Sequence, residues 1–287
     1  MYKHFEGAIM KVISFVNMKG GVGKTTLAVN VADVLSRRLG QRVLLVDLDP
    51  QFNATQSLFS GDEYVKLRKA GADTVYEIFA NPTPIMSVVD GPSKIAPKKL
   101  ADIKPTNISV GLDVLLGNLE IYRVEMVPGQ GTEMRLKGFL KLKENDYDYV
   151  IVDTPPTPSV FMNSALLASN FYVVPIKPEP ISRVGIDLLQ GVINRVSENN
   201  GHDIICAGVV VTMANVATLV YKECMAQLKA EPLWSSRLLR RHIPIRTAIA
   251  RDQGKQKLIL DGNDVVSKGA ITAVVNEIVE RTDVAIT

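Results

Sequence analysis

The sequence predicts a doubly wound α/β fold, in which helices cover both faces of a mostly parallel β-sheet. Short runs of almost entirely apolar residues recur along the chain, as is typical of strands that are buried on both faces. Longer segments with the apolar periodicity of helices lie between these runs. A glycine-rich loop joins the first apolar run to the first helical segment. Strands and helices that alternate in this order indicate an open parallel sheet.

The expected elements follow in chain order. The expected strands are 12–16, 43–46, 112–116, 149–152, 171–176 and 204–212. The expected helices are 25–39, 74–80, 133–143, 160–169, 181–199, 216–230 and 264–281. In the first helix, Leu27, Val31 and Val34 fall on one face. Gly40 stands directly after this helix, where a glycine commonly ends one.

The loop after the first strand, residues 18–26, reads Met-Lys-Gly-Gly-Val-Gly-Lys-Thr-Thr. Glycines let backbone N–H groups turn toward phosphate oxygens, because no side chain blocks the approach. Lys24 can reach the β- and γ-phosphates of a nucleotide, and the Thr25 hydroxyl can hold Mg²⁺. The first glycine of the usual motif is replaced by Met18, and a second lysine, Lys19, follows it. The sequence therefore predicts a phosphate-binding loop with one additional cation.

Acidic residues follow two of the expected strands. Asp47 and Asp49 come after 43–46, and Asp153 comes after 149–152. In an open α/β sheet the ligand lies beyond the carboxyl ends of the strands. One strand that ends in aspartate often means only a turn. Two such strands beside a lysine-rich phosphate loop predict carboxylates that serve Mg²⁺ and an attacking water.

Residues from about 60 to 130 are the least regular part of the chain. Prolines interrupt this region repeatedly, and only 74–80 and 112–116 resemble a helix and a strand. We interpret it as an elaboration of one domain that spans residues 1–287. Loose regions of this kind can recognise partners, although plain surface loops are the more common explanation.

A basic segment lies near the C-terminus, from Arg237 to Lys257. It carries seven Lys or Arg residues against one acid, Asp252, while the whole chain has a net charge of only +3. A solvated surface would explain this charge, and a polyanion partner is the alternative. The candidate phosphate contacts are Arg240, Arg241, Arg246, Arg251 and Lys255.

The composition excludes several classes of protein. With 46% hydrophobic and 22% charged residues, the chain is not of the disordered type. No apolar run approaches the roughly 18 residues of a membrane span, and the N-terminus lacks a signal-peptide pattern. Cys206 and Cys224 form neither a disulfide framework nor a metal motif. We therefore expect a cytoplasmic protein from a reducing compartment.

Three motifs together resemble those of a known family. They are 19–26 (Lys-Gly-Gly-Val-Gly-Lys-Thr-Thr), 47–55 (Asp-Leu-Asp-Pro-Gln-Phe-Asn-Ala-Thr) and 153–156 (Asp-Thr-Pro-Pro). The chain resembles the ParA family of deviant-Walker ATPases, which segregate plasmids, chromosomes and other cellular cargo. The resemblance runs from about residue 11 to residue 279 and is weakest in the elaboration. The first motif is shared with MinD and the nitrogenase iron protein, whereas the second is much more specific to the ParA branch.

The resemblance implies a role for single residues. Lys24 would bind phosphates, and Lys19 matches the signature lysine that reaches the phosphates of the other subunit in a dimer. In other NTPases a cation delivered in this way raises the rate by roughly 10³–10⁵. Asp49 matches the aspartate that orients the attacking water. Asp153 matches the aspartate that holds Mg²⁺ through water, and the predicted metal set is Thr25, Asp49 and Asp153.

The remaining implied contacts concern the rest of the nucleotide. Asp47 would be a supporting hydrogen-bond acceptor, and 154–156 would sense the γ-phosphate. Adenine is expected near Met213 and Pro244. The other predicted nucleotide contacts are Gly20, Gly21, Val22, Gly23 and Thr26.

The resemblance also implies a cycle and its partners. ATP would join two chains into a sandwich dimer that binds DNA without sequence preference, and hydrolysis would separate them. The protein would associate with the nucleoid, and a ParB-like adaptor would stimulate hydrolysis. The cargo and the adaptor cannot be named from the sequence.

Other functions on the same fold make different demands. A MinD-like ATPase at a membrane surface needs a basic amphipathic C-terminal helix, whereas 274–287 carries one basic residue against three acids. We therefore expect no membrane partner. Electron transfer or iron–sulfur delivery needs paired cysteines near a dimer axis. A small-molecule ligase would turn over ATP without a polymer.

Overall fold

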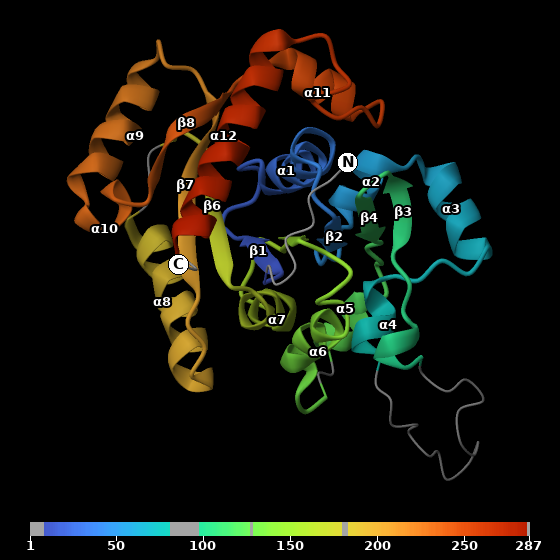
Figure 1. The fold of residues 1–287 in the computed structure, drawn as a ribbon. Helices are drawn as coiled ribbons and strands as arrows, with labels where there is room; N and C mark the ends of the chain where they lie inside the picture. The colour runs from blue at the N-terminus through green and yellow to red at the C-terminus, as the bar shows by residue number, and fades with distance from the viewer. Residues whose placement is uncertain (1–8, 81–97, 127–128, 180–182, 286–287) are drawn as a thin grey trace.

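The computed structural model describes residues 9–80, 98–126, 129–179 and 183–285. Within these residues, eight strands form one sheet in the order β3-β4-β2-β5-β1-β6-β7-β8 (Figure 1). Neighbouring strands are parallel except for β3 and β4, which are antiparallel. The predicted doubly wound α/β fold is confirmed.

Six of the strands correspond to the expected apolar runs, and β3 and β8 were not expected. The bounds are β1 Lys11–Phe15, β2 Val43–Asp47, β3 Thr106–Ser109, β4 Leu112–Leu115, β5 Tyr149–Asp153, β6 Phe171–Ile176, β7 Ile205–Ala214 and β8 Leu238–Pro244. The two unexpected strands lie at the two edges of the sheet. Edge strands carry polar and charged side chains, and this composition hides them from a search for apolar runs.

Within the described residues the expected helices are present, although residues 181 and 182 of the expected helix 181–199 lie outside them. Five further helices in this part of the chain were not expected: α2, α3, α5, α10 and α11. The bounds are α1 Lys24–Leu39, α2 Asn53–Leu58, α3 Gly61–Lys69, α4 Val75–Phe79, α5 Ile121–Met126, α6 Arg135–Lys141, α7 Val160–Ala168, α8 Arg183–Asn200, α9 Leu219–Ala230, α10 Pro232–Ser235, α11 Thr247–Gln253 and α12 Val265–Val284. Single 3₁₀ turns lie at Leu100–Asp102 and Thr132–Met134.

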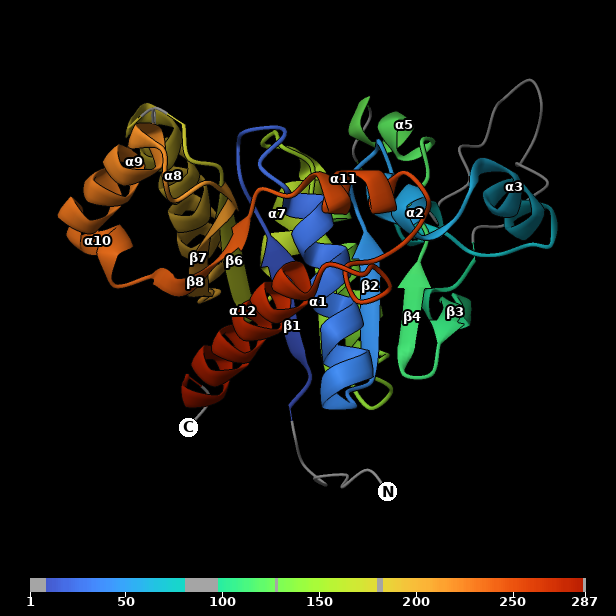
Figure 2. The same ribbon diagram turned by 90° about the horizontal axis from the view of Figure 1, so that it is seen from above.

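Helices cover both faces of the sheet (Figure 2). Ile13 and Phe15 of β1 belong to a core with α1 and α12, whereas Val12 belongs to a core with α6 and α7. A third core joins α7, α8 and α9 to β6 and β7. Because side chains alternate along a strand, β1 contributes to both layers, as its uninterrupted apolar sequence predicts.

The irregular region is built onto this sheet. Its strand β4 runs parallel to β2, with Val43 opposite Leu112 and Val46 opposite Leu115. The helix α3 lies beyond the β3 edge, whereas α4 and α5 pack with α6 into the core on one face of the sheet (Figure 1). The segment between α2 and β5 therefore adds β3 and β4 to the sheet and places helices beside the ends of β2 and β4.

Candidate functional site

The glycine-rich loop connects the carboxyl end of β1 to the start of α1. Gly23 is the N-cap of α1 and has a left-handed φ of 79°, and Gly21 has a φ of 71°. Both angles are strained for any other residue type. The Thr212 hydroxyl of β7 donates a hydrogen bond of 2.7 Å to the Val22 carbonyl. The loop is thus held against the sheet, and the free N–H groups at the start of α1 form an anion-binding end.

A cleft of about 690 Å³ opens beside this loop. Its walls come from the loop, from the residues after β2, and from α11 and the turn that follows it. Among the predicted site residues, the cleft is lined by Gly20, Gly21, Gly23, Lys24, Thr25, Thr26, Asp49 and Met213. Val22 is buried behind the loop. The phosphate loop and Asp49 therefore line one cavity.

Lys24 and Asp49 lie close together in this cleft. Each residue is only 7% exposed. Burial lowers the pKa of the Lys24 ammonium, while the carboxylates of Asp153 and Asp49 act in the opposite direction. Burial raises the pKa of Asp49, and a hydrogen bond of 2.9 Å from the Gln51 N–H to its Oδ1 counteracts this effect. One carboxylate oxygen of Asp49 is thus held by the turn that follows it.

Asp153 lies fully buried at the end of β5. Neither of its carboxylate oxygens has a hydrogen-bond partner among the described residues. Burial raises the pKa of Asp153 to about 7, and the nearby Thr25 hydroxyl and Lys24 ammonium reduce this shift, whereas Asp49 increases it. A buried carboxylate without partners is costly. The site is therefore incomplete around Asp153.

This carboxylate fits a magnesium site that includes a nucleotide. Mg²⁺ prefers oxygen ligands, keeps several waters, and is commonly held by one or two carboxylates together with substrate phosphates. Thr25 and Asp153 supply oxygens of this kind beside the phosphate loop. The described residues contain no group of three His, Cys, Asp or Glu that could hold a metal without such help.

Asp47 has a supporting role. Its Oδ2 accepts hydrogen bonds from the N–H and the hydroxyl of Thr55, each of 2.7 Å. Burial raises its pKa well above the usual range, and the neighbouring Asp153 adds to this effect. The interpretation of Asp47 as a hydrogen-bond acceptor is confirmed.

An apolar cavity of about 350 Å³ adjoins the phosphate cleft. Met213 lines both spaces, and Pro244 lines the apolar one with Ile243, Ile245 and Ile249. Met213 has a φ of 49°, a left-handed conformation that is uncommon for residues other than glycine. The two residues expected near adenine therefore line one largely apolar pocket.

Lys19 lies outside the phosphate cleft. Its side chain is 59% exposed and forms an ion pair with Glu179, which also pairs with Lys177 at 2.7 Å. These two lysines lower the pKa of Glu179 to about 2. Sequence reasoning missed Glu179, because it follows β6 and no local motif connects it to the loop.

The basic segment does not form one uniform surface. Arg240 pairs with Glu277 and Glu280 of α12, at 3.4 and 3.2 Å. Arg246 pairs at 2.9 Å with Asp264, the N-cap of α12, and Arg251 pairs with its neighbour Asp252 at 3.2 Å. The candidates without an ion pair inside the described ranges are Arg241 and Lys255. Sequence reasoning treated all five residues as equivalent, whereas three of them have acidic partners.

No helix in the described part of the chain is long and apolar enough to cross a membrane.

Comparisons with known proteins agree with this geometry. A family model described as an AAA domain matches residues 10–205. The chain is 31% identical to the sporulation initiation inhibitor protein Soj of Bacillus subtilis, over 88% of this chain and 91% of Soj. It is 30% identical to the chromosome-partitioning ATPase Soj of Treponema pallidum, over 76% of this chain and 77% of that protein.

The fold also resembles solved structures that contain nucleotides. A putative plasmid partition protein of Borrelia burgdorferi bound to AMPPNP has a TM-score of 0.70 at 24% identity, over 95% of this chain and 98% of that chain. A cobyrinic acid a,c-diamide synthase of Mycobacterium smegmatis with bound ATP analogue and magnesium has a TM-score of 0.71 at 25% identity, over 93% of both chains.

Proposed function

The chain belongs to the ParA/Soj family of P-loop ATPases, and from this premise we propose that it is an ATP-dependent switch that moves or positions cargo. ATP joins two chains into a sandwich dimer, the dimer binds DNA without sequence preference, and hydrolysis separates the two chains. The cargo is a plasmid, a chromosome or another large assembly. The observation that carries this proposal is the cleft in which the buried Lys24 lies beside Asp49 and Asp153.

Each part of the cleft has a role in the proposed hydrolysis. The loop N–H groups and Lys24 hold the phosphates and neutralise their charge. Asp49 orients the attacking water with Oδ2, because its Oδ1 is held by Gln51. Thr25 and Asp153 would hold Mg²⁺, which would neutralise negative charge on the phosphates. The apolar cavity at Met213 and Pro244 receives the adenine.

The position of Lys19 supports the dimer. Lys24 lines the cleft, whereas Lys19 does not and extends into solvent. A cation placed in this way is available to the phosphates of a second chain. The test mixes a Lys19→Gln protein with an Asp49→Ala protein, each inactive alone. A mixed dimer contains one site with an intact Asp49 and a Lys19 from the other chain.

The mixture is expected to hydrolyse ATP faster than the sum of the two separate variants. Activity equal to that sum would contradict a role for Lys19 across the interface. The matched control replaces Lys19→Gln by Lys141→Gln, a change of an exposed lysine on α6, which leaves hydrolysis intact before mixing.

Arg241 and Lys255 are the strongest candidates for DNA contacts. Both are exposed and lack an ion pair in the described ranges. Binding of random duplex DNA in ATP is expected to weaken with salt, and each lost phosphate contact lowers the slope of log K against log salt by about 0.9. Arg241→Ala and Lys255→Ala are compared with Lys141→Ala. Salt-insensitive binding, or equal affinity in all three variants, would exclude this surface.

The proposed adaptor can be sought by affinity capture from the native lysate in ATP and in ADP. A protein retained only in ATP should raise the ATPase rate, and DNA should raise it further. Turnover driven by a small carboxylic acid without DNA would instead favour a ligase. This second outcome is included because one similar structure is described as a synthase.

A further inference from the structure

The turn after β2 holds the carboxylate of Asp49. The Gln51 N–H donates to Asp49 Oδ1 at 2.9 Å, and the Phe52 N–H donates to the Asp49 carbonyl at 2.8 Å. The chain then enters α2, where the Gln56 N–H donates to the Phe52 carbonyl. Both bonds hold Asp49 in a turn that leads directly into Phe52.

Phe52 adopts an unusual backbone conformation for its residue type. Its φ is 43° and its ψ is 40°, in the left-handed region that favours glycine. A bulky residue remains in this region only where its surroundings compensate for the strain, and such residues concentrate in functional loops. Phe52 thus needs external support that glycine would not need.

Tyr64 of α3 provides this support. The rings of Phe52 and Tyr64 are stacked, with centroids 5.4 Å apart and planes inclined by 23°. The Tyr64 hydroxyl donates to the Gly117 carbonyl at 3.0 Å. A methyl group on Gly117 would lie 2.4 Å from the Phe52 Cβ and 2.7 Å from Asp47 Oδ2. Tyr64 and Gly117 therefore hold Phe52 from two sides.

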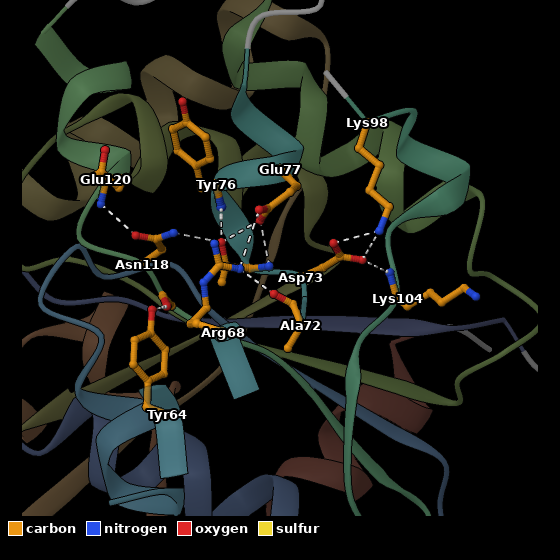
Figure 3. Close-up of polar contacts among 12 residues, drawn as sticks. Tyr64, Arg68, Ala72, Asp73, Tyr76, Glu77, Lys98, Lys104, Asn118 and Glu120 are labelled. Carbon is orange, nitrogen blue, oxygen red and sulfur yellow. Dashed lines mark hydrogen bonds and ion pairs between the residues drawn. The ribbon is translucent and has the colours of Figure 1, made fainter. Parts of the chain in front are cut away.

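Tyr64 and Leu67 of α3 are partly buried against the core, and polar contacts within the elaboration add to this packing. The Arg68 guanidinium donates to the Ala72 carbonyl and lies 3.6 Å from Glu77 of α4 (Figure 3). The Asn118 amide, next to Gly117, donates to the Thr74 hydroxyl at 3.1 Å. A network on the elaboration thus connects α3, α4 and the end of β4 to the turn that holds Asp49.

We infer that the elaboration is part of the hydrolytic machinery, because Tyr64 holds Phe52 in its left-handed conformation and thereby orients Asp49. Phe52 and Tyr64 are positioning residues, which act on the attacking water only through Asp49. This inference rests on the proposed role of Asp49 in ATP hydrolysis. It also assigns a role to α3, which has no buried residue and no contact with the phosphate cleft.

The test is a double-mutant cycle of Tyr64→Leu and Phe52→Gly. Tyr64→Leu should lower kcat about tenfold. The loss of a stacked aromatic pair is expected to shift the equilibrium between the held and released turn by roughly tenfold. Affinity for a slowly hydrolysed ATP analogue should change less than about twofold, because the phosphate loop is untouched. In the Phe52→Gly background, Tyr64→Leu should have little effect on kcat, because glycine needs no support.

Two further variants separate positioning from general damage. Tyr64→Phe keeps the stacked ring and should retain most of the wild-type kcat. Tyr122→Leu changes an exposed tyrosine of α5 and should leave kcat unchanged. Hydrogen exchange of the peptide 48–58, measured without nucleotide, should accelerate in Tyr64→Leu but not in Tyr122→Leu.

The inference is overturned if Tyr64→Leu lowers kcat equally in both backgrounds, or leaves both kcat and hydrogen exchange unchanged. A wild-type protein that binds the analogue but never hydrolyses ATP would instead overturn the proposed function. In that case the exchange measurement still decides whether Tyr64 holds the turn.

Discussion

The phosphate loop at residues 18–26 and the basic segment at residues 237–257 behave differently as sequence signals. The loop signal comes from consecutive residues, and the structure brings most of them to one cleft. The basic segment is just as conspicuous in the sequence, yet the structure divides it between β8 and α11. Arg240 pairs with the buried Glu277, while the adjacent Arg241 has no ion pair within the described ranges.

The difference shows which chemistry short sequence patterns encode. A phosphate loop works through backbone conformation, which nearby glycines determine. A charged surface depends on the charges that remain after ion pairing. Arg240 and Arg246 have partner acids in α12 and at its N-cap, which the local sequence pattern does not reveal.

Lys24→Ala should produce the largest loss. Removing this cation from the cleft should lower kcat/KM for ATP by about 10²–10³-fold, as expected for a buried group that stabilises charge in the transition state. Lys255→Ala, in the basic segment, should change ATP turnover by less than about twofold. Steady-state ATPase assays on both variants check this, with circular dichroism to confirm folding. Equal losses would contradict the expected difference between the phosphate loop and the basic segment.

Arg240→Ala and Arg241→Ala form a matched pair inside the basic segment. Arg240→Ala should lower the free energy of unfolding by about 1–3 kcal/mol, because the Glu277 carboxylate is 4% exposed and loses a charged donor. Arg241→Ala should change it by less than about 0.5 kcal/mol. Urea denaturation measures both, and similar stabilities would show that the Arg240 pair has no structural role.

Stability should depend on pH through the phosphate site. Because burial raises the pKa of Asp153 to about 7, the folded protein binds more protons than the unfolded chain between about pH 4 and 7. The free energy of unfolding without nucleotide should therefore fall as pH rises through this window, by at most about 1.4 kcal/mol per pH unit for this group.

Asp153→Asn should reduce this slope, and Asp47, Asp49 and Asp33, whose pKa values burial also raises, would contribute to what remains. Lys141→Ala, a change at an exposed position of α6, should leave the slope unchanged, since side-chain ammonium groups ordinarily stay charged throughout this range. Urea denaturation between pH 5 and 8 checks both variants. A slope that Asp153→Asn does not alter would contradict the raised pKa.

Glu179→Gln should have the smallest effect. It releases Lys19 from an exposed ion pair, and such pairs contribute about 0–1 kcal/mol. ATP turnover should therefore rise by no more than about fivefold, if Lys19 acts on the partner chain. Lys177→Gln, which removes the other lysine on Glu179, is the matched control. A fall in turnover for Glu179→Gln would mean that this ion pair assists Lys19 instead of restraining it.

Much of the fold could be predicted because buried parallel strands and amphipathic helices repeat over short distances. The strands β3 and β8 were missed, since polar edge strands lack the apolar signal. Short helices such as α3 were missed as well, because a helix without buried residues shows no apolar face. The pairs Lys19–Glu179 and Phe52–Tyr64 could not be predicted, because no local pattern connects their members.

The apolar strands, most of the long helices, the phosphate loop and the carboxylates at the ends of β2 and β5 could all be read from the sequence. These features depend on neighbouring residues, since backbone conformation and burial periodicity are local properties. Only the tertiary structure decided which arginines are neutralised, where an adenine can lie, and how the elaboration supports the turn at Asp49. These depend on side chains that meet only after packing has brought distant segments together.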